Sequence, residues 1–203
     1  MEKPAPCEVP VNDLIRRRWS PRAFESRPVE PEKLRSFFEA ARWAASTMNS
    51  QPWHFIVATK DDAENFSRVL QTFVENNQAW AKNAPVIGLS VAATNFANNG
   101  KPNRVALHDM GQADAFLALE AVSLGLQLHQ MGGILPDKAR EIFGVPQGYE
   151  VVAGWALGYP GDPNSLPDNL REREVAARQR KAASEFVYSG RWGEVAALVK
   201  PKD

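Results

Sequence analysis

Residues 105–130 read VALHDMGQADAFLALEAVSLGLQLHQ, the longest apolar-rich stretch of the chain. Its apolar side chains recur at helical spacing and lie nearly all round a helix: Leu107, Met110, Ala113, Phe116, Leu117, Leu119, Ala121, Val122, Leu124, Leu126 and Leu128. A helix that is apolar on most faces is buried on most faces. In a chain of 203 residues, this pattern predicts a long central helix that is partly covered by a second subunit.

Polar residues and glycines set limits on this helix. Asp114, Glu120, Ser123 and Gln127 interrupt its apolar run, so it does not predict a membrane span, which needs roughly 20 nearly uninterrupted apolar residues. Gly111 and Gly125 weaken it by about 1 kcal/mol each relative to alanine, and we interpret them as points of close helix–helix contact. Gly132 and Gly133 are predicted to end it.

Shorter sequence patterns on either side of this stretch predict the remaining helices and strands. Helical signals predict helices over about 11–17, from Pro31 to about 45, over 63–74, near Ala79 and over 136–143. Short runs of β-forming residues predict strands over 53–59, 86–92 and 150–159. Residues 94–104 are rich in Asn, Gly and Pro and predict a loop. Helices and well-separated short strands together predict an α+β fold in a single domain over residues 1–203.

Composition excludes several classes of function. The 24 basic and 24 acidic residues balance, which gives no support to a nucleic-acid or membrane-surface binder. Cys7 is the only cysteine, so neither an internal disulfide nor a cysteine metal site is expected. His108 and His129 would lie about 30 Å apart on one helix, too far to share a metal. With no signal-peptide pattern, we expect a cytoplasmic protein.

Two polar motifs are the candidates for a binding site. Arg18–Arg22 (RWSPR) places two guanidinium groups around the Ser20 hydroxyl, which suits a phosphate. Ser46–Trp53 (STMNSQPW) offers hydroxyls and amides that could bond to the edge of a heterocycle. The alternatives are a solvated basic turn for the first motif and a helix end that satisfies its own backbone for the second.

Other catalytic patterns do not occur in the chain. It has no G-x-S-x-G, no G-x-G-x-x-G after a strand and no phosphate-binding G-x-x-x-x-G-K-[ST]. Cys7 is too close to the N-terminus to serve in a Cys/His nucleophile pair. The lack of a protein catalyst is expected if a cofactor carries the chemistry.

Taken together, four motifs in this order resemble those of the FMN-dependent nitroreductase family. They are RWSPRAF at 18–24, STMNSQPWHF at 46–55, MGGI at 131–134, and RQRK at 178–181 with EFV at 185–187. The resemblance spans about residues 11–192. The chain departs from the family's usual pattern at two places. Trp80 and Lys82 follow Asn77, where the family often has a Lys or Arg, and Ala182-Ala183 replaces a frequent Pro-Leu.

The resemblance implies a role for each candidate residue. Arg18, Arg178 and Arg180 would hold the FMN phosphate, and Ser20 and Arg22 would lie along the ribityl chain and pyrimidine edge. Ser46, Thr47, Asn49 and Gln51 would reach the flavin of the other subunit. The backbone at Gly132 and Gly133 would approach flavin N5. Asn77 is a further cofactor-binding residue carried over from the family. No catalytic side chain is expected, because the flavin is the reactive group.

The resemblance also implies a fold and an activity. The fold would be a central antiparallel or mixed sheet flanked by helices, in an intertwined homodimer with FMN at the interface. The C-terminal arm, about residues 164–203, would pack on the partner. The activity would be NAD(P)H-dependent reduction of nitroaromatics, quinones or similar acceptors, by ping-pong hydride transfer through N5. The alternatives are an FMN store or redox sensor, and a specialised reductive dehalogenase or dehydrogenase of the same fold.

Overall fold

The computed structural model describes residues 1–200. Its helices are α1 (Asp13–Arg17), α2 (Pro31–Arg42), α3 (Ala63–Leu70), α4 (Glu75–Ala81), α5 (Ala106–Ser123), α6 (Pro136–Phe143) and α7 (Asp168–Val175). Its strands are β1 (Trp53–Thr59), β2 (Val86–Ala93), β3 (Gln127–Met131) and β4 (Tyr149–Gly158). Short 3-10 turns lie at Thr47–Asn49, Pro163–Ser165, Ala183–Glu185 and Ala197–Val199.

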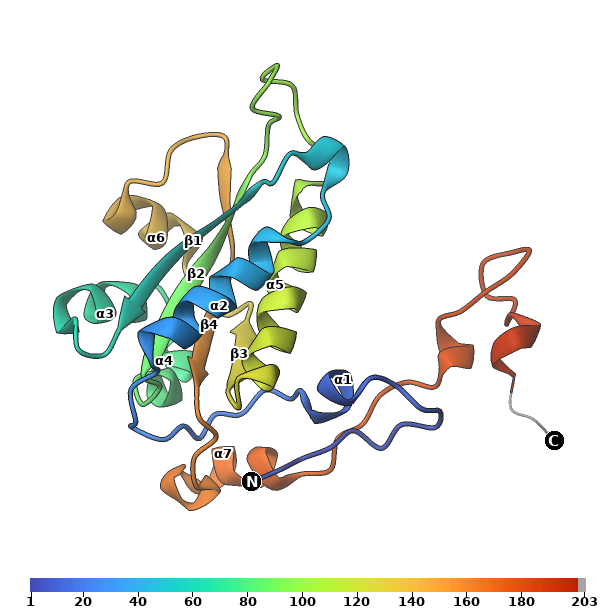
Figure 1. The fold of residues 1–203 in the computed structure, drawn as a ribbon, viewed down its shortest axis with the longest axis horizontal. Helices are drawn as coiled ribbons and strands as arrows, with labels where there is room; N and C mark the ends of the chain where they lie inside the picture. Colours follow the sequence, from blue (N-terminus) through green and yellow to red (C-terminus); the bar gives the residue numbers. More distant parts are fainter. Residues whose placement is uncertain (201–203) are drawn as a thin grey trace.

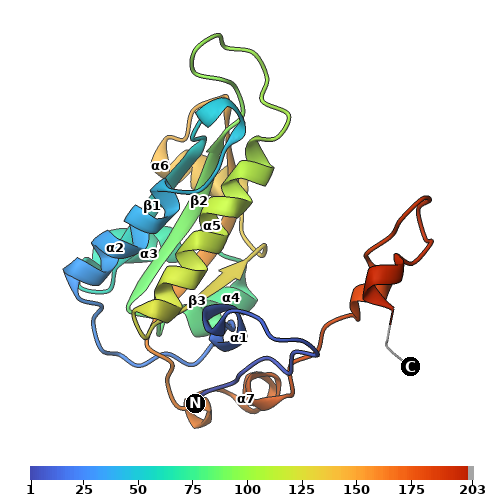
Figure 2. The same cartoon turned by 45° about the vertical axis from the view of Figure 1, so that its right-hand side comes forward.

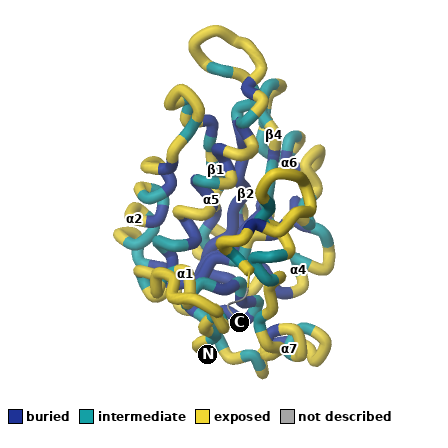
Figure 3. The backbone as a smooth tube through the Cα atoms, turned by 90° about the vertical axis from the view of Figure 1, so that its right-hand side faces the viewer, coloured by how far each residue is buried: buried dark blue, intermediate teal, exposed yellow. Residues whose placement is uncertain are grey.

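The four strands form one antiparallel sheet in the order β1-β2-β4-β3. Strands β2 and β4 lie in the centre, and the buried residues concentrate there (Figure 3). A register shift between Ser90 and Val91 interrupts the pairing of β2 with β4. The predicted α+β class is confirmed, and the sheet is antiparallel throughout.

Helices cover both faces of the sheet, so the molecule has three layers (Figure 1). Helices α2 and α5 cover one face, where Phe37 and Leu117 pack with Trp155. On the other face, Phe66 of α3, Trp80 of α4 and Ala139 of α6 share a second core. Residues of one strand alternate between the two cores, as the twofold period of a strand requires.

The long helix is shorter than the sequence pattern predicts. Helix α5 ends at Ser123, and residues 127–131 form the edge strand β3, paired with β4 from Gln127↔Gly158 to Met131↔Gly154. Gly125 has a φ of +77°, while its N–H donates to Val122 O and the N–H of Leu126 donates to Ala121 O. This is a Schellman stop. Gly125, and not Gly132-Gly133, therefore ends the helix, and His108 and His129 lie on different elements.

The C-terminal segment leaves the body of the molecule. Helix α7 lies beneath the sheet near the N-terminus, and the chain beyond it extends away from the core in both views (Figures 1 and 2). Trp192 is 93% exposed and Phe186 is 60% exposed. Residues 201–203, the end of the predicted arm, lie outside the described residues. Within residues 1–200, no helix has the length and apolar character needed to cross a membrane.

Candidate functional site

A cavity of about 330 Å³ lies between helix α5 and strand β3. Small or apolar residues of α5 form its wall: Gly111, Ala115, Ala118 and Leu119. Arg18, Ser20, Leu128 and Gln130 complete the lining. The cavity therefore joins an apolar helix face to the polar Arg18–Arg22 motif.

Three arginines gather at the polar side of this site. A guanidinium N–H of Arg18 donates to the Ser20 hydroxyl at 3.2 Å. Burial lowers the pKa of Arg18, and the nearby charges of Arg178 and Arg180 lower it further. Within residues 1–200, no carboxylate forms an ion pair with any of these three arginines. A cluster of cations that lacks a protein anion is suited to bind an external one.

The backbone of the motif is fixed by strand β3. The Gln127 side-chain oxygen accepts from the Trp19 N–H at 3.1 Å, and His129 Nδ1 lies 2.8 Å from the carbonyl of Pro21. Burial lowers the pKa of His129 to about 4. The ring is therefore neutral near pH 7, and its Nδ1–H donates to Pro21. Strand β3 thus holds the motif beside the cavity.

Arg22 points toward helix α7 and not into open solvent. Its guanidinium lies 3.8 Å from the carboxylate of Glu174, and both groups are largely buried. Burial and the charge of Arg173 lower the pKa of Arg22, whereas Glu174 raises it. Arg22 is therefore partly neutralised by the protein itself, unlike Arg18.

Asn77 and Gly133 meet at the end of strand β3. The Asn77 side-chain amide donates to the Gly133 carbonyl at 2.9 Å. A Cβ on Gly133 would lie 2.5 Å from the Asn77 side-chain nitrogen, so only glycine allows this approach. Trp80, one turn after Asn77, lies 4.4 Å from the His129 ring, centroid to centroid. The Asn77–Gly133 pair is thus linked through His129 to the Arg18–Arg22 motif.

The Ser46–Gln51 turn is strained. Three non-glycine residues, Met48, Asn49 and Gln51, have φ values of +53°, +53° and +45°. Such conformations cost about 1–3 kcal/mol each and cluster at ligand sites. The turn is held by the buried carboxylate of Asp109, which accepts from the Thr47 N–H at 2.9 Å. Ser46 Oγ accepts from the Gln51 N–H at 3.0 Å.

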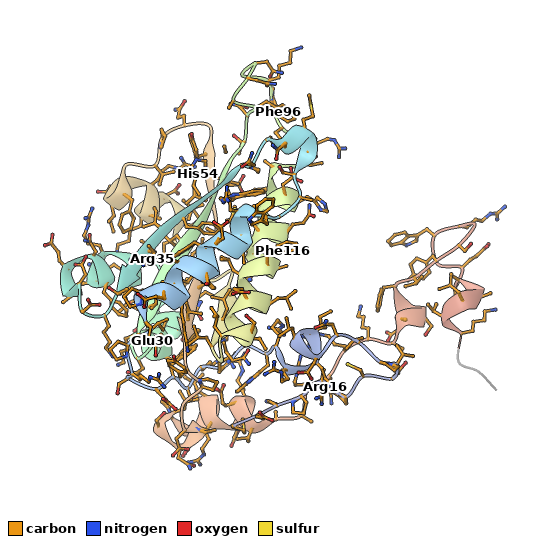
Figure 4. All side chains as sticks on the ribbon, viewed as in Figure 1. Arg16, Glu30, Arg35, His54, Phe96 and Phe116 are labelled. Carbon is orange, nitrogen blue, oxygen red and sulfur yellow. The ribbon has the colours of Figure 1, made fainter. Side chains whose placement is uncertain are left out.

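The turn and the arginine cluster do not meet within one chain. The turn contacts the first part of helix α5 at Asp109. Helix α1, which leads into the Arg18–Arg22 motif, lies beside the other end of α5 (Figures 1 and 2). In Figure 4, Phe96, in the loop near the turn, lies at the top of the molecule, and Arg16 of α1 lies in its lower part. The predicted site residues therefore form two separate groups.

Several residues that support the site carry no local sequence signal. Glu174, Asp109 and Gln127 bond to backbone that is far away in the sequence, and no local pattern marks them. The helical spacing of residues 105–130 places His129, and Gln130 of the cavity wall, on a helix, whereas both lie on strand β3. Period-2 alternation over Gln127–Met131, with Gly125 before it, is the signal that could have placed both on a strand.

Comparison with known sequences decides the family. The sequence model of the nitroreductase family matches residues 15–159. The chain belongs to the nitroreductase family. The match runs from within α1 through β4 and includes every residue that lines the cavity, so the predicted resemblance is confirmed.

The chain is also similar to individual known proteins. The structure is similar to that of an oxidoreductase containing FMN, with 38% sequence identity, a TM-score of 0.87, and coverage of 94% of this chain and 96% of that one. A 15.4 kDa uncharacterized protein of Mycolicibacterium smegmatis is 38% identical over 100 residues, 48% of this chain and 67% of that protein. An NADH dehydrogenase of Thermus thermophilus is 28% identical over 173 residues, 72% of this chain and 84% of that protein.

Proposed function

We propose that this protein is an FMN-dependent NAD(P)H oxidoreductase that reduces nitroaromatics, quinones or similar conjugated acceptors. The observation that carries the proposal is the cluster of Arg18, Arg178 and Arg180. Within residues 1–200 these three cations form no ion pair with a carboxylate, and they lie beside a cavity whose helix wall consists of small or apolar residues. The family, the FMN-containing structural neighbour and the NADH dehydrogenase relative support the same function.

The residues present fit FMN. The arginine cluster and the Ser20 hydroxyl suit a phosphate monoester, because guanidinium groups match its geometry. Gly111, Ala115 and Ala118 leave room along α5 for a flat ring system. The exposed amide of Asn49 can hydrogen-bond a ring edge. Bound FMN would supply the hydride chemistry, accepting hydride from NAD(P)H and passing reducing equivalents to the acceptor.

The protein's own part would be to position and to stabilise charge. Arg18, Arg178 and Arg180 would anchor the phosphate. Ser20 and Arg22 would lie toward the ribityl chain and the pyrimidine edge, where a cation favours added negative charge on the ring. Gly132, Gly133 and Asn77 would approach the reactive edge, and the Asn77 amide already holds the Gly133 carbonyl in place.

A homodimer would complete the site. Leu107 and Phe116 are 44% and 40% exposed on α5, on the face where Gly111 and Ala115 also lie uncovered. Antiparallel packing of two copies of this face would bring the turn of one chain toward the arginine cluster of the other. Ser46, Thr47, Asn49 and Gln51 would then contact the partner's flavin. The extended arm with Phe186 and Trp192 would wrap the partner.

The test is an anaerobic visible spectrum of the FMN-loaded protein before and after adding NADPH or NADH. We expect the flavin absorbance to bleach within seconds and to return when a nitroaromatic or a quinone is added. A flavin spectrum that neither donor bleaches would refute the reductase and point to a flavin store or redox sensor.

A further inference from the structure

Glu174 of helix α7 is a buried carboxylate aimed at the Arg18–Arg22 motif. Its side chain is 1% exposed. One oxygen accepts from the Arg22 N–H at 2.8 Å and from the Ala23 N–H at 3.0 Å, and the second accepts from the Arg22 N–H at 3.0 Å. Glu174 lies outside the residues matched by the family model, 15–159.

Burying a carboxylate is unfavourable unless it is paired or hydrogen-bonded, and Glu is almost never fully buried without a partner. Here the compensation comes from backbone N–H groups of the motif and from the Arg22 guanidinium at 3.8 Å. The carboxylate therefore fixes the end of the segment that carries Arg18 and Ser20. Its contacts are with the protein backbone, and it does not line the cavity.

The same residue is connected to the other half of the arginine cluster. The backbone carbonyl of Glu174 accepts from the Lys3 ammonium group. The carbonyl of Lys3 in turn accepts from Arg178 Nη1 at 2.8 Å, and that nitrogen also donates to the Arg16 carbonyl at 3.0 Å. Glu174, Lys3 and Arg178 thus form a chain of contacts that returns to helix α1, just before Arg18.

We propose that Glu174 is a positioning residue for the phosphate end of the flavin site. Its carboxylate holds the Arg18–Arg22 backbone, and its backbone carbonyl contacts Lys3, which in turn contacts Arg178. Through the carboxylate contacts, it sets the preference for a flavin with a phosphate over one without. This proposal rests on the proposed FMN-dependent function.

Riboflavin separates positioning from general stability, because it carries the same ring as FMN and lacks the phosphate. If Glu174 positions the phosphate site, its loss lowers the affinity for FMN by a larger factor than the affinity for riboflavin. If Glu174 only stabilises the fold, both affinities fall together or neither changes.

The experiment is a fluorescence titration of the full-length apoprotein with FMN and with riboflavin. For Glu174→Ala, we expect the ratio of FMN affinity to riboflavin affinity to fall at least about tenfold, equivalent to about 1.4 kcal/mol. Glu174→Gln keeps an acceptor oxygen and should restore most of the FMN preference. Arg18→Ala is the positive reference, which should abolish that preference.

Glu172→Ala is the matched control, since it removes an exposed carboxylate from the same helix. It should leave the FMN-to-riboflavin ratio unchanged. An unchanged ratio in Glu174→Ala overturns the proposal. If the alanine variant does not fold, Glu174→Asp decides, because the shorter side chain cannot reach both N–H groups: a lower ratio supports positioning and an unchanged ratio contradicts it. Failure of the unmodified protein to bind either flavin would instead contradict the proposed function.

Discussion

At the residue scale, Asp114 is a buried charge on the core side of α5. Its carboxylate accepts from the Ser90 hydroxyl at 2.7 Å. Burial raises its pKa from 3.8 to about 6, and the Ser90 hydrogen bond opposes the rise. Between these two values, the folded protein binds a proton that the unfolded chain has released. Stability from this group is therefore greatest at low pH and is lost as pH rises through about 6.

We accordingly predict that Asp114→Asn raises the free energy of unfolding by about 1–3 kcal/mol near pH 8, and that less than half of this gain remains near pH 4.5. The amide oxygen can still accept from Ser90, so the change mainly removes the charge. Urea unfolding at the two pH values, without added flavin, measures this gain in the free energy of unfolding. A gain of equal size at both pH values would show that the carboxylate of Asp114 is not destabilised by burial.

At the element scale, the end of α5 depends on Gly125. A φ of +77° is unfavourable for any residue with a Cβ. We predict that Gly125→Ala destabilises the fold by about 1 kcal/mol, which lowers Tm by about 2–4 °C for a chain of this size. Ser123→Ala, exposed in the last turn of the same helix, should change stability by less than about 0.5 kcal/mol. Thermal unfolding measures the Tm of both variants. Equal Tm values would show that the positive φ at position 125 does not require glycine.

The same element shows how far the sequence could predict the fold. The sequence predicts helix α6 and strand β1 with their observed bounds. Pro136 is a strong local signal for the start of the helix, and β-branched residues are a strong local signal for the strand. Strand β3 was missed because Leu126 and Leu128 also continue the helical spacing of α5. Its pairing with β4, a contact distant in sequence, decides the conformation.

The candidate site likewise contains residues that the sequence predicts and residues that it does not. Arg18, Ser20 and the 46–51 turn were recognisable from short polar motifs, and their roles remain predictions. The supports Glu174 and Asp109 act across long sequence separations, so only the folded chain shows them.

At the scale of the whole molecule, the two groups of site residues lie toward opposite ends of α5, and apolar surface remains uncovered on α5 and on the arm. A second copy of the chain would join the groups and cover this surface. We therefore propose that the flavin site is made by two chains.

Sedimentation velocity of the FMN-loaded protein, recorded at the visible absorbance of flavin, tests this claim most directly. We predict that the flavin moves with a species of twice the 22.5 kDa chain mass, at one FMN per chain. Flavin that sediments stoichiometrically with a single chain would contradict the shared site.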